Sequence, residues 1–123
     1  MDIPVVFEAE YKLAQIIWQY APMNTRKLID LSLYTLGWKR TTTYTVLKKL
    51  CSRGIFWMEN SQVSVLIPEY QVQLSQSEAF LQRTFRGSLP DFIAAFTDSK
   101  RLSMHDAREI RRIIDEYEAS SHV

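Results

Sequence analysis

The 123-residue sequence contains a single cysteine, Cys51, so it cannot form an internal disulfide. Such sparing use of cysteine is typical of proteins of the reducing cytoplasm. No apolar run approaches the roughly 20 residues that a membrane-spanning helix requires. The first residues, Met1-Asp2-Ile3-Pro4, lack the basic start and the apolar core of a signal peptide. We therefore expect a cytoplasmic protein.

Glycine is also scarce and occurs only as Gly37, Gly54 and Gly87. This excludes a glycine-rich phosphate loop, and the sequence contains neither a zincin motif nor a nucleophile elbow. His105 and His122 have no ligand partners at metal-binding spacing. The sequence therefore predicts that the chain is not an enzyme and that it needs no metal or cofactor.

Charge is nearly balanced over the whole chain, at a net +1, but its distribution is uneven. Residues 1–60 carry 8 Lys/Arg against 5 Asp/Glu, a net of +3, whereas residues 61–123 carry 7 against 9, a net of −2. A surface that faces phosphates would need positive charge concentrated in this way. The 46% hydrophobic content is ordinary for a globular protein and can supply a core.

Residues 38–54, WKRTTTYTVLKKLCSRG, are the most informative stretch, because residues 39–53 contain five basic residues and no acid. A helix would end at Gly54, and its inward side would carry Thr43, Val46, Leu47 and Leu50. Hydroxyls reach base edges or phosphates, and cations neutralise phosphates. An ordinary solvated amphipathic helix is the alternative. As a recognition helix, the segment would contact DNA through Lys39, Arg40, Thr41, Thr42, Tyr44, Thr45, Lys48 and Lys49.

The segments before this stretch complete a helix-turn-helix. Apolar residues at helical spacing predict a helix over 7–20, and Pro22 prevents its continuation. Asn24 or Thr25 caps a second helix over about 25–35. Its candidate inward residues are Leu28, Ile29, Leu31 and Leu33. Two short helices joined by a tight turn, the second one basic, are typical of a helix-turn-helix.

The segments after it predict a β-hairpin. Residues 55–58 and 63–67 are rich in β-forming side chains and are separated by the turn residues 59–62. The module is therefore a winged helix, and we expect the DNA-binding domain to cover residues 1–70. Because the wing tip contains no Lys or Arg, its phosphate contacts would be weak or made by amides and hydroxyls.

Residues 71–123 are expected to form a second domain of three amphipathic helices. The first covers 71–86, and Ser88 and Ser103 cap the other two, each with an aspartate three residues later. Such helices cannot bury their apolar faces well alone, so pairing with a second copy is the natural solution. Folding back onto the winged helix is the alternative. The expected dimerisation residues are Leu89, Phe92, Ile93, Phe96, Ile110, Ile113, Ile114 and Tyr117.

Several motifs, when they occur together in one chain, are specific to one protein family. They are Glu8 to Tyr11, Ile16-Ile17-Trp18, Trp38, residues 42–50, Arg53-Gly54-Ile55, residues 85–89 and Leu102-Ser103 to Ile114. The family has a characteristic order of residues. A tryptophan is followed by Thr-x-x-Thr and two hydrophobic residues, then by a basic residue and leucine, and finally by Lys/Arg-Gly. On these motifs the chain resembles the BlaI/MecI penicillinase-repressor family of bacterial transcription regulators over nearly its whole length.

The resemblance implies a homodimeric repressor that binds a palindromic DNA operator and blocks transcription. Thr42 and Thr45 match recognition-helix threonines, whereas the family often has lysine in place of Thr41 and arginine in place of Tyr44. These two departures bear on the operator sequence. The copper-responsive branch of the family has C-terminal Cys-x-Cys pairs, which this chain lacks.

The resemblance also implies a route to induction. Relatives are inactivated by cleavage in the C-terminal domain, triggered by a membrane sensor-protease, often at an Asn-Phe bond. The matching positions here are Ala95 and Phe96, so the phenylalanine is present and the asparagine is absent.

We therefore predict a mainly α protein with a small β-hairpin wing, which comprises a winged helix-turn-helix and a C-terminal three-helix dimerisation region. The predicted function is sequence-specific transcriptional repression. One alternative is a winged-helix protein-interaction module, which the five-to-zero charge balance of residues 39–53 disfavours. A second is a regulator that an effector, rather than proteolysis, releases from DNA.

Overall fold

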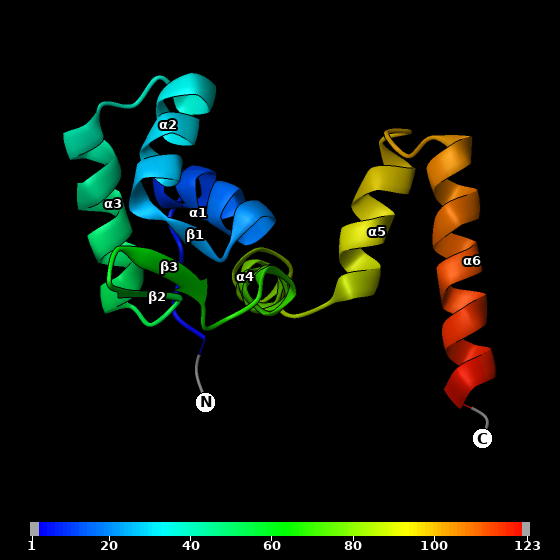
Figure 1. Ribbon diagram of the computed structural model, residues 1–123. Coiled ribbons are helices and arrows are strands. Elements are labelled where there is room, and N and C mark those ends of the chain that lie inside the picture. Colours follow the sequence, from blue (N-terminus) through cyan, green and yellow to red (C-terminus); the bar gives the residue numbers. More distant parts are fainter. Residues whose placement is uncertain (1–2, 122–123) are drawn as a thin grey trace. The chain divides into compact units, whose positions relative to one another are not determined.

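The computed structural model describes residues 3–121, and within them six helices and a small antiparallel sheet form two compact units (Figure 1). The units are Met1–Ser77 and Glu78–Val123. This confirms the predicted mainly α fold class with a small wing. The elements are α1 (Glu8–Tyr20), β1 (Met23–Asn24), α2 (Thr25–Leu36), α3 (Arg40–Ser52), β2 (Phe56–Glu59), β3 (Gln62–Val65), α4 (Glu69–Phe85), α5 (Leu89–Asp98) and α6 (Met104–Ser121).

The core of the first unit lies between α1, α2, α3 and the sheet. Its fully buried side chains include Leu13, Ile17, Leu28, Leu47, Leu50, Phe56 and Val63. Trp18 connects α1 to the end of the hairpin, because its indole N–H donates to the Ile67 carbonyl at 2.9 Å. The expected inward position of Leu33 is wrong, since 57% of this residue is exposed on the outer side of α2.

Both ends of α2 and the end of α3 follow from local chemistry. The Asn24 side chain accepts a hydrogen bond from the Lys27 amide at 2.8 Å and so caps α2, as the sequence predicts. Gly37 ends α2 in the left-handed conformation, at φ +71°. After α3, the Ile55 amide donates to the Leu50 carbonyl and the Gly54 amide to the Cys51 carbonyl, which is a Schellman motif. Gly54 has φ +78°, a conformation that favours glycine.

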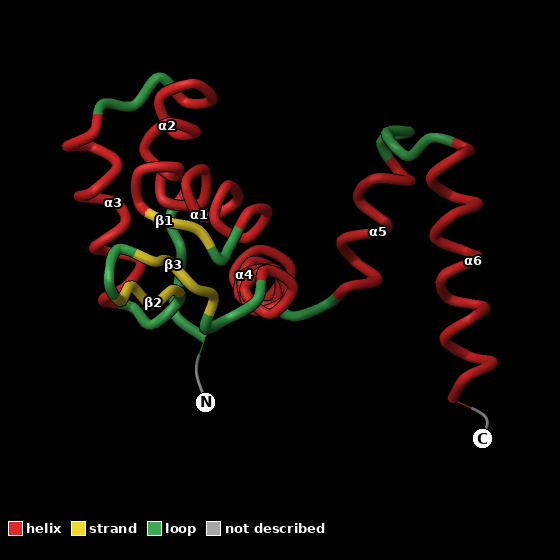
Figure 2. The backbone as a smooth tube through the Cα atoms, in the orientation of Figure 1, coloured by secondary structure: helices red, strands yellow, loops and turns green. Residues whose placement is uncertain are grey.

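The wing is a two-residue hairpin joined to a third strand. Asn60 and Ser61 both have positive φ values, 53° and 62°, which matches the twist of the flanking strands β2 and β3. The short strand β1 pairs with the other edge of β3, so the sheet order is β1-β3-β2 (Figure 2). The strand pairing between β1 and β3 therefore connects the start of α2 directly to the wing.

The first compact unit includes the first half of α4. Val72 is fully buried in the core of the winged helix. The Gln76 side chain accepts a hydrogen bond from the Val6 amide at 2.9 Å. These two contacts attach the first half of α4 to the winged helix.

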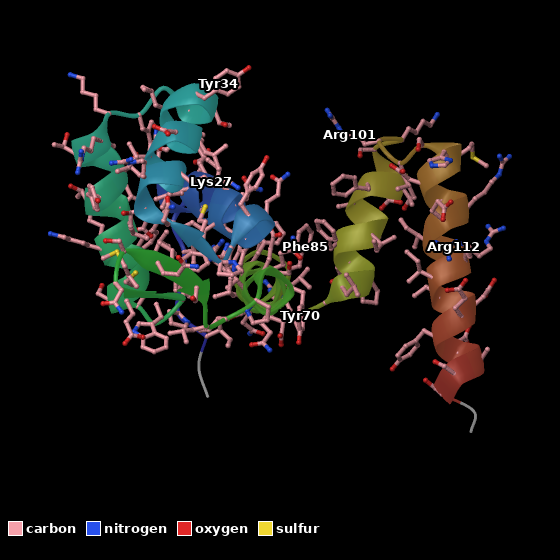
Figure 3. The ribbon with its side chains drawn as sticks, in the orientation of Figure 1. Lys27, Tyr34, Tyr70, Phe85, Arg101 and Arg112 are labelled. Atoms are coloured by element: carbon pink, nitrogen blue, oxygen red, sulfur yellow. The ribbon has the colours of Figure 1, made fainter. Side chains whose placement is uncertain are left out.

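The second unit contains the remainder of α4 and the helices α5 and α6. Ser88 and Ser103 cap α5 and α6 through the amides of Asp91 and Asp106, at 3.1 Å and 3.0 Å. Across Leu89–Asp98 and Met104–Ser121, no residue is buried. The end of α4 and α5 contact each other through an aromatic cluster of Phe80, Phe85, Phe92 and Phe96. Its neighbouring ring centroids lie 5.1 to 6.0 Å apart. Phe85, at the end of α4, is labelled in Figure 3.

In the part of the chain from residue 3 to residue 121, no helix is both long and apolar enough to cross a membrane. Within the same residues, no group of three His, Cys, Asp or Glu side chains could hold a metal ion. His122 lies outside the described residues.

Candidate nucleic-acid interface

The outward side of α3 carries most of the predicted DNA-contacting residues. Its exposed members are Thr41, Thr42, Thr45, Lys48 and Lys49. The predicted inward residues Thr43, Leu47 and Leu50 are buried, which fixes the orientation of the helix. The Thr45 hydroxyl donates to the Thr41 carbonyl at 2.9 Å, so its oxygen lone pairs remain able to accept a hydrogen bond.

The start of α3 is strongly electropositive. Lys39 is the N-cap residue and Arg40 the first helical residue, both exposed, and the first turn contains no acid. Within the described residues, no side chain caps this helix start, so its first amide groups are not satisfied by a cap. Helix N-termini attract anions and disfavour cations, by about 0.3–1 kcal/mol for each exposed charge. This arrangement suits a surface that receives a phosphate.

Tyr44 differs from its expected place on the outer face. It is half-buried, and its hydroxyl donates to the Thr25 hydroxyl of α2 at 3.4 Å. The guanidinium of Arg40 lies over its ring, 5.6 Å from the centroid. The Thr25 hydroxyl, which can donate to the phenolate form, and then the nearby Arg40 charge lower the pKa of the Tyr44 phenol. Tyr44 therefore faces α2 and Arg40 rather than lying with the exposed threonines.

Arg53, the fifth basic residue of the stretch, has a structural partner. Its guanidinium forms an ion pair with the carboxylate of Glu10 on α1 and lies 4.9 Å from the ring centroid of Phe7. Glu10 is buried, and its carboxylate also accepts a hydrogen bond from the Phe7 amide. Four cations of residues 39–53 thus lie on the exposed side of α3 or at its start, and Arg53 connects α3 to α1.

A cleft that the sequence reasoning missed lies beside the start of α3. We call it the α2–α3 cleft; it measures about 530 Å³ and is lined by Asn24, Thr25, Arg26, Ile29, Asp30, Arg40, Tyr44 and Ser61. The available signal was the first turn of α2, which contains Arg26 and Lys27 and no acid. The ammonium of Lys27, a residue labelled in Figure 3, lies over the Tyr20 ring. It is 5.2 Å from the ring centroid.

The wing contributes little charge to this surface. Glu59 is the only charged residue between positions 55 and 67. Trp57, which pairs with Ser64 across the hairpin, is 53% exposed. The described wing therefore offers hydroxyls, amides and an indole ring instead of cations.

The predicted dimerisation residues form a partly exposed apolar surface on the second unit. Exposed members are Leu89, Phe96, Ile113, Ile114 and Tyr117, and half-buried members are Phe92, Ile93 and Ile110. A groove of about 270 Å³ runs between α5 and α6 over Phe92, Ile93, Phe96 and Ile110. Arg112 of α6, labelled in Figure 3, forms ion pairs with Glu109 and Glu116 of the same helix. Both N–O distances are 2.8 Å.

The predicted cleavage positions lie within α5. Ala95 and Phe96 are both exposed, and the Ser99 hydroxyl donates to the Ala95 carbonyl at 2.8 Å. Their backbone is helical, so a protease would have to open the helix locally before it could cut the bond.

Cys51 is half-buried on the inward margin of α3, and burial raises the pKa of its thiol. A raised pKa lowers the fraction of reactive thiolate. This is the environment of an inert structural thiol.

The fold and this surface together define a winged helix-turn-helix protein. Its recognition-helix position is occupied by α3, which exposes hydroxyls and cations. Comparison with known proteins then gives its family. The family model described as "Penicillinase repressor" matches residues 7–116, so the chain belongs to the penicillinase repressor family of transcriptional repressors.

Two named relatives are similar over almost their full lengths. The penicillinase repressor of Bacillus licheniformis is 27% identical over 119 residues, which cover 94% of this chain and 93% of the relative. The methicillin resistance regulatory protein MecI of Staphylococcus aureus is 20% identical over 114 residues, which cover 89% and 93%. The printed names of both relatives describe regulators.

Proposed function

We propose that this chain is a sequence-specific DNA-binding repressor that inserts α3 into the major groove of a palindromic operator. The observation that carries the proposal is the side of α3 that exposes Thr42, Thr45 and Lys48 while its opposite side is buried. Threonine hydroxyls and methyls read base edges, and lysines neutralise the flanking phosphates. Such a protein would act in the cytoplasm, where the operator DNA lies.

We further propose that the protein acts as a homodimer through its second unit. The support is the apolar side of α5 and α6, where Leu89, Ile113 and Tyr117 are each more than half exposed. A second copy would cover these residues and would place two α3 helices on the two halves of a palindrome. No other function has a specific observation in its favour.

One experiment tests the DNA-binding proposal. Purified full-length protein is used to select bound sequences from a random duplex pool, and affinities are then measured on the selected duplex and on a scrambled one. We expect an enriched palindrome that is bound at least 10³-fold more tightly than scrambled DNA at physiological salt. Recovery of no enriched sequence, with equal affinity for both duplexes, would contradict sequence-specific repression.

Release of repression is proposed to occur by proteolysis of the C-terminal unit near Ala95 and Phe96, through a membrane sensor-protease. The basis is the family resemblance at Phe96. Mass spectrometry of the repressor recovered from cells, before and after induction by a cell-wall-active antibiotic, tests this step. If transcription is released while the protein stays full-length, an effector rather than a protease releases it.

A further inference from the structure

The α2–α3 cleft brings together two arginines from the starts of two different helices. We propose that this cleft binds one phosphate of the DNA backbone, held by Arg26 and Arg40, separately from the base contacts of α3. The inference rests on the DNA binding proposed above, and it adds Arg26 to the interface. It also gives Tyr44 a role as a positioning residue for Arg40.

The charges of the cleft favour a phosphate. Among residues 3–121, neither Arg26 nor Arg40 forms an ion pair. Guanidinium groups match the geometry of phosphate oxygens and can bind them through two parallel hydrogen bonds. Each arginine lies in the first turn of its helix, where a cation without a bound anion is disfavoured. A phosphate between them would relieve both unfavourable interactions.

The backbone at the start of α2 adds a donor. The Thr25 amide donates to the Ser61 carbonyl at 2.9 Å, and the Lys27 amide donates to the Asn24 side chain at 2.8 Å. Among residues 3–121, the Arg26 amide between them has no hydrogen-bond acceptor. An amide at a helix N-terminus is well suited to an anion. The bond to Ser61 also fixes the wing tip at the edge of the same cleft.

Tyr44 sets the position of Arg40. Its hydroxyl is bonded to Thr25 on α2, and its ring lies under the Arg40 guanidinium, 5.6 Å from it. A guanidinium over an aromatic face is held by the ring quadrupole and loses less freedom when it binds a ligand. Tyr44 therefore directs Arg40 toward the cleft and leaves base contacts to Thr42 and Thr45.

The occupant is the DNA backbone rather than a free phosphate, because the cleft is continuous with the exposed side of α3. Arg40 belongs to both surfaces. When a recognition helix enters the major groove, the phosphates that flank the groove pass beside its ends, where positioning contacts are made. Asp30 is the one acid in the lining and weakens the attraction for any anion.

The test compares three charge-removing variants on the selected duplex and on scrambled DNA. R26Q should weaken binding to both duplexes equally and should reduce the salt slope by about one unit. The ratio of wild-type to R26Q affinity should then fall about threefold between 50 and 200 mM salt. K12Q is the matched control, because Lys12 lines a different cavity with Val6 and Tyr11 and should change nothing. K48Q removes a proposed phosphate contact on α3 itself.

These variants separate the two proposals. If wild-type protein binds no duplex, the proposed function fails. If K48Q lowers the salt slope while R26Q behaves like K12Q, only the cleft assignment fails. D30N provides a change of opposite sign, and we expect about two- to fivefold tighter binding to both duplexes at low salt. Weaker or unchanged binding by D30N would overturn the assignment even if R26Q failed to fold.

Two further measurements distinguish the source of the phosphate. In ethylation interference, one ethylated backbone phosphate should block wild-type binding but not R26Q binding. Inorganic phosphate alone, titrated into the protein and followed by the Arg Nε–H resonances of its NMR spectrum, should produce no saturable shift of Arg26 or Arg40 below millimolar concentration. Saturation at lower concentration, without any backbone position sensitive to R26Q, would assign the cleft to free phosphate instead.

Discussion

The side-chain hydroxyls of Ser32 and Thr43 lie 2.7 Å apart inside the contact between α2 and α3, and both residues are at least 99% buried. This hydrogen bond connects the two helices of the helix-turn-helix at the point where both side chains are buried. A buried hydroxyl that loses its partner costs about 1–3 kcal/mol, whereas replacing both partners by apolar groups of similar shape can be nearly neutral.

Replacing Ser32 with alanine should therefore lower the free energy of unfolding by about 1–3 kcal/mol, because the Thr43 hydroxyl stays buried without a partner. Thr43→Val should also destabilise the protein, since it leaves Ser32 unpaired. The double variant should recover much of the loss of either single variant. Urea denaturation of the four proteins measures this, with Ser52→Ala as an exposed serine control on α3. If the loss of unfolding free energy in the double variant equals the sum of the two single losses, the two hydroxyls do not form a pairwise hydrogen bond.

Arg53 and Lys48 belong to the same basic stretch but should behave in opposite ways. Arg53→Gln breaks the ion pair with the buried Glu10 and should destabilise the fold by about 1–3 kcal/mol, below the roughly 3–5 of a fully buried pair because Arg53 is partly exposed. It should leave the salt slope of DNA binding unchanged. Lys48→Gln should lower that slope by about one unit and leave stability unchanged. Denaturation and anisotropy titrations at several salt concentrations give both quantities. A lower salt slope for Arg53→Gln would return Arg53 to the DNA-facing set.

The contrast between these residues shows what sequence reasoning could reach. Helical periodicity placed Thr43 and Leu47 inward correctly, because a 3.6-residue repeat needs only local information. The partner of Arg53 lies 43 residues away, and no local pattern contains a contact of that range. Tyr44 was placed outward by the same periodicity, but it lies at the margin of the helix, where a neighbouring helix decides the exposure.

Thr45 should discriminate between DNA sequences, unlike the lysines. Replacing Thr45 with alanine should weaken binding to the selected operator by about 1–3 kcal/mol and should hardly affect scrambled DNA, because a hydroxyl at a base edge contributes only where the base matches. Its loss should not affect folding, since the hydroxyl is exposed and bonds only within α3. Competition titrations with both duplexes measure the two affinities. Equal losses on the two DNAs would remove Thr45 from the base-contacting set.

Cys51 should react slowly with alkylating reagents in the folded protein. Burial raises the pKa of its thiol, so the thiolate fraction at pH 8 is below that of a free cysteine, and the rate should rise only at higher pH. Iodoacetamide labelling between pH 7 and 10, followed by mass spectrometry, measures this profile. The same chain unfolded in urea is the control and should label at the rate of an ordinary thiol. Faster labelling of the folded chain at pH 7 would instead support a redox-sensing cysteine.

Ile113 tests the proposed assembly and its effect on DNA affinity. It is 54% exposed on the apolar side of α6, and an aspartate there would put a charge into any interface that covers it. If the protein is the proposed dimer, Ile113→Asp should convert it to monomers in light scattering, whereas Asp115→Asn on the polar side of the same helix should not. Because two linked α3 helices bind two half-sites as one ligand, loss of linkage should weaken operator binding by about 10²–10⁴-fold.

Affinity for a single half-site tests whether that loss comes from assembly alone. The first unit does not contain Ile113, so binding of Ile113→Asp to one half-site should match that of the wild-type protein. A variant that remains a dimer and binds the full palindrome at wild-type affinity would place the interface elsewhere. A monomer that has also lost half-site binding would indicate that the two units depend on each other for folding, which contradicts a separable second unit.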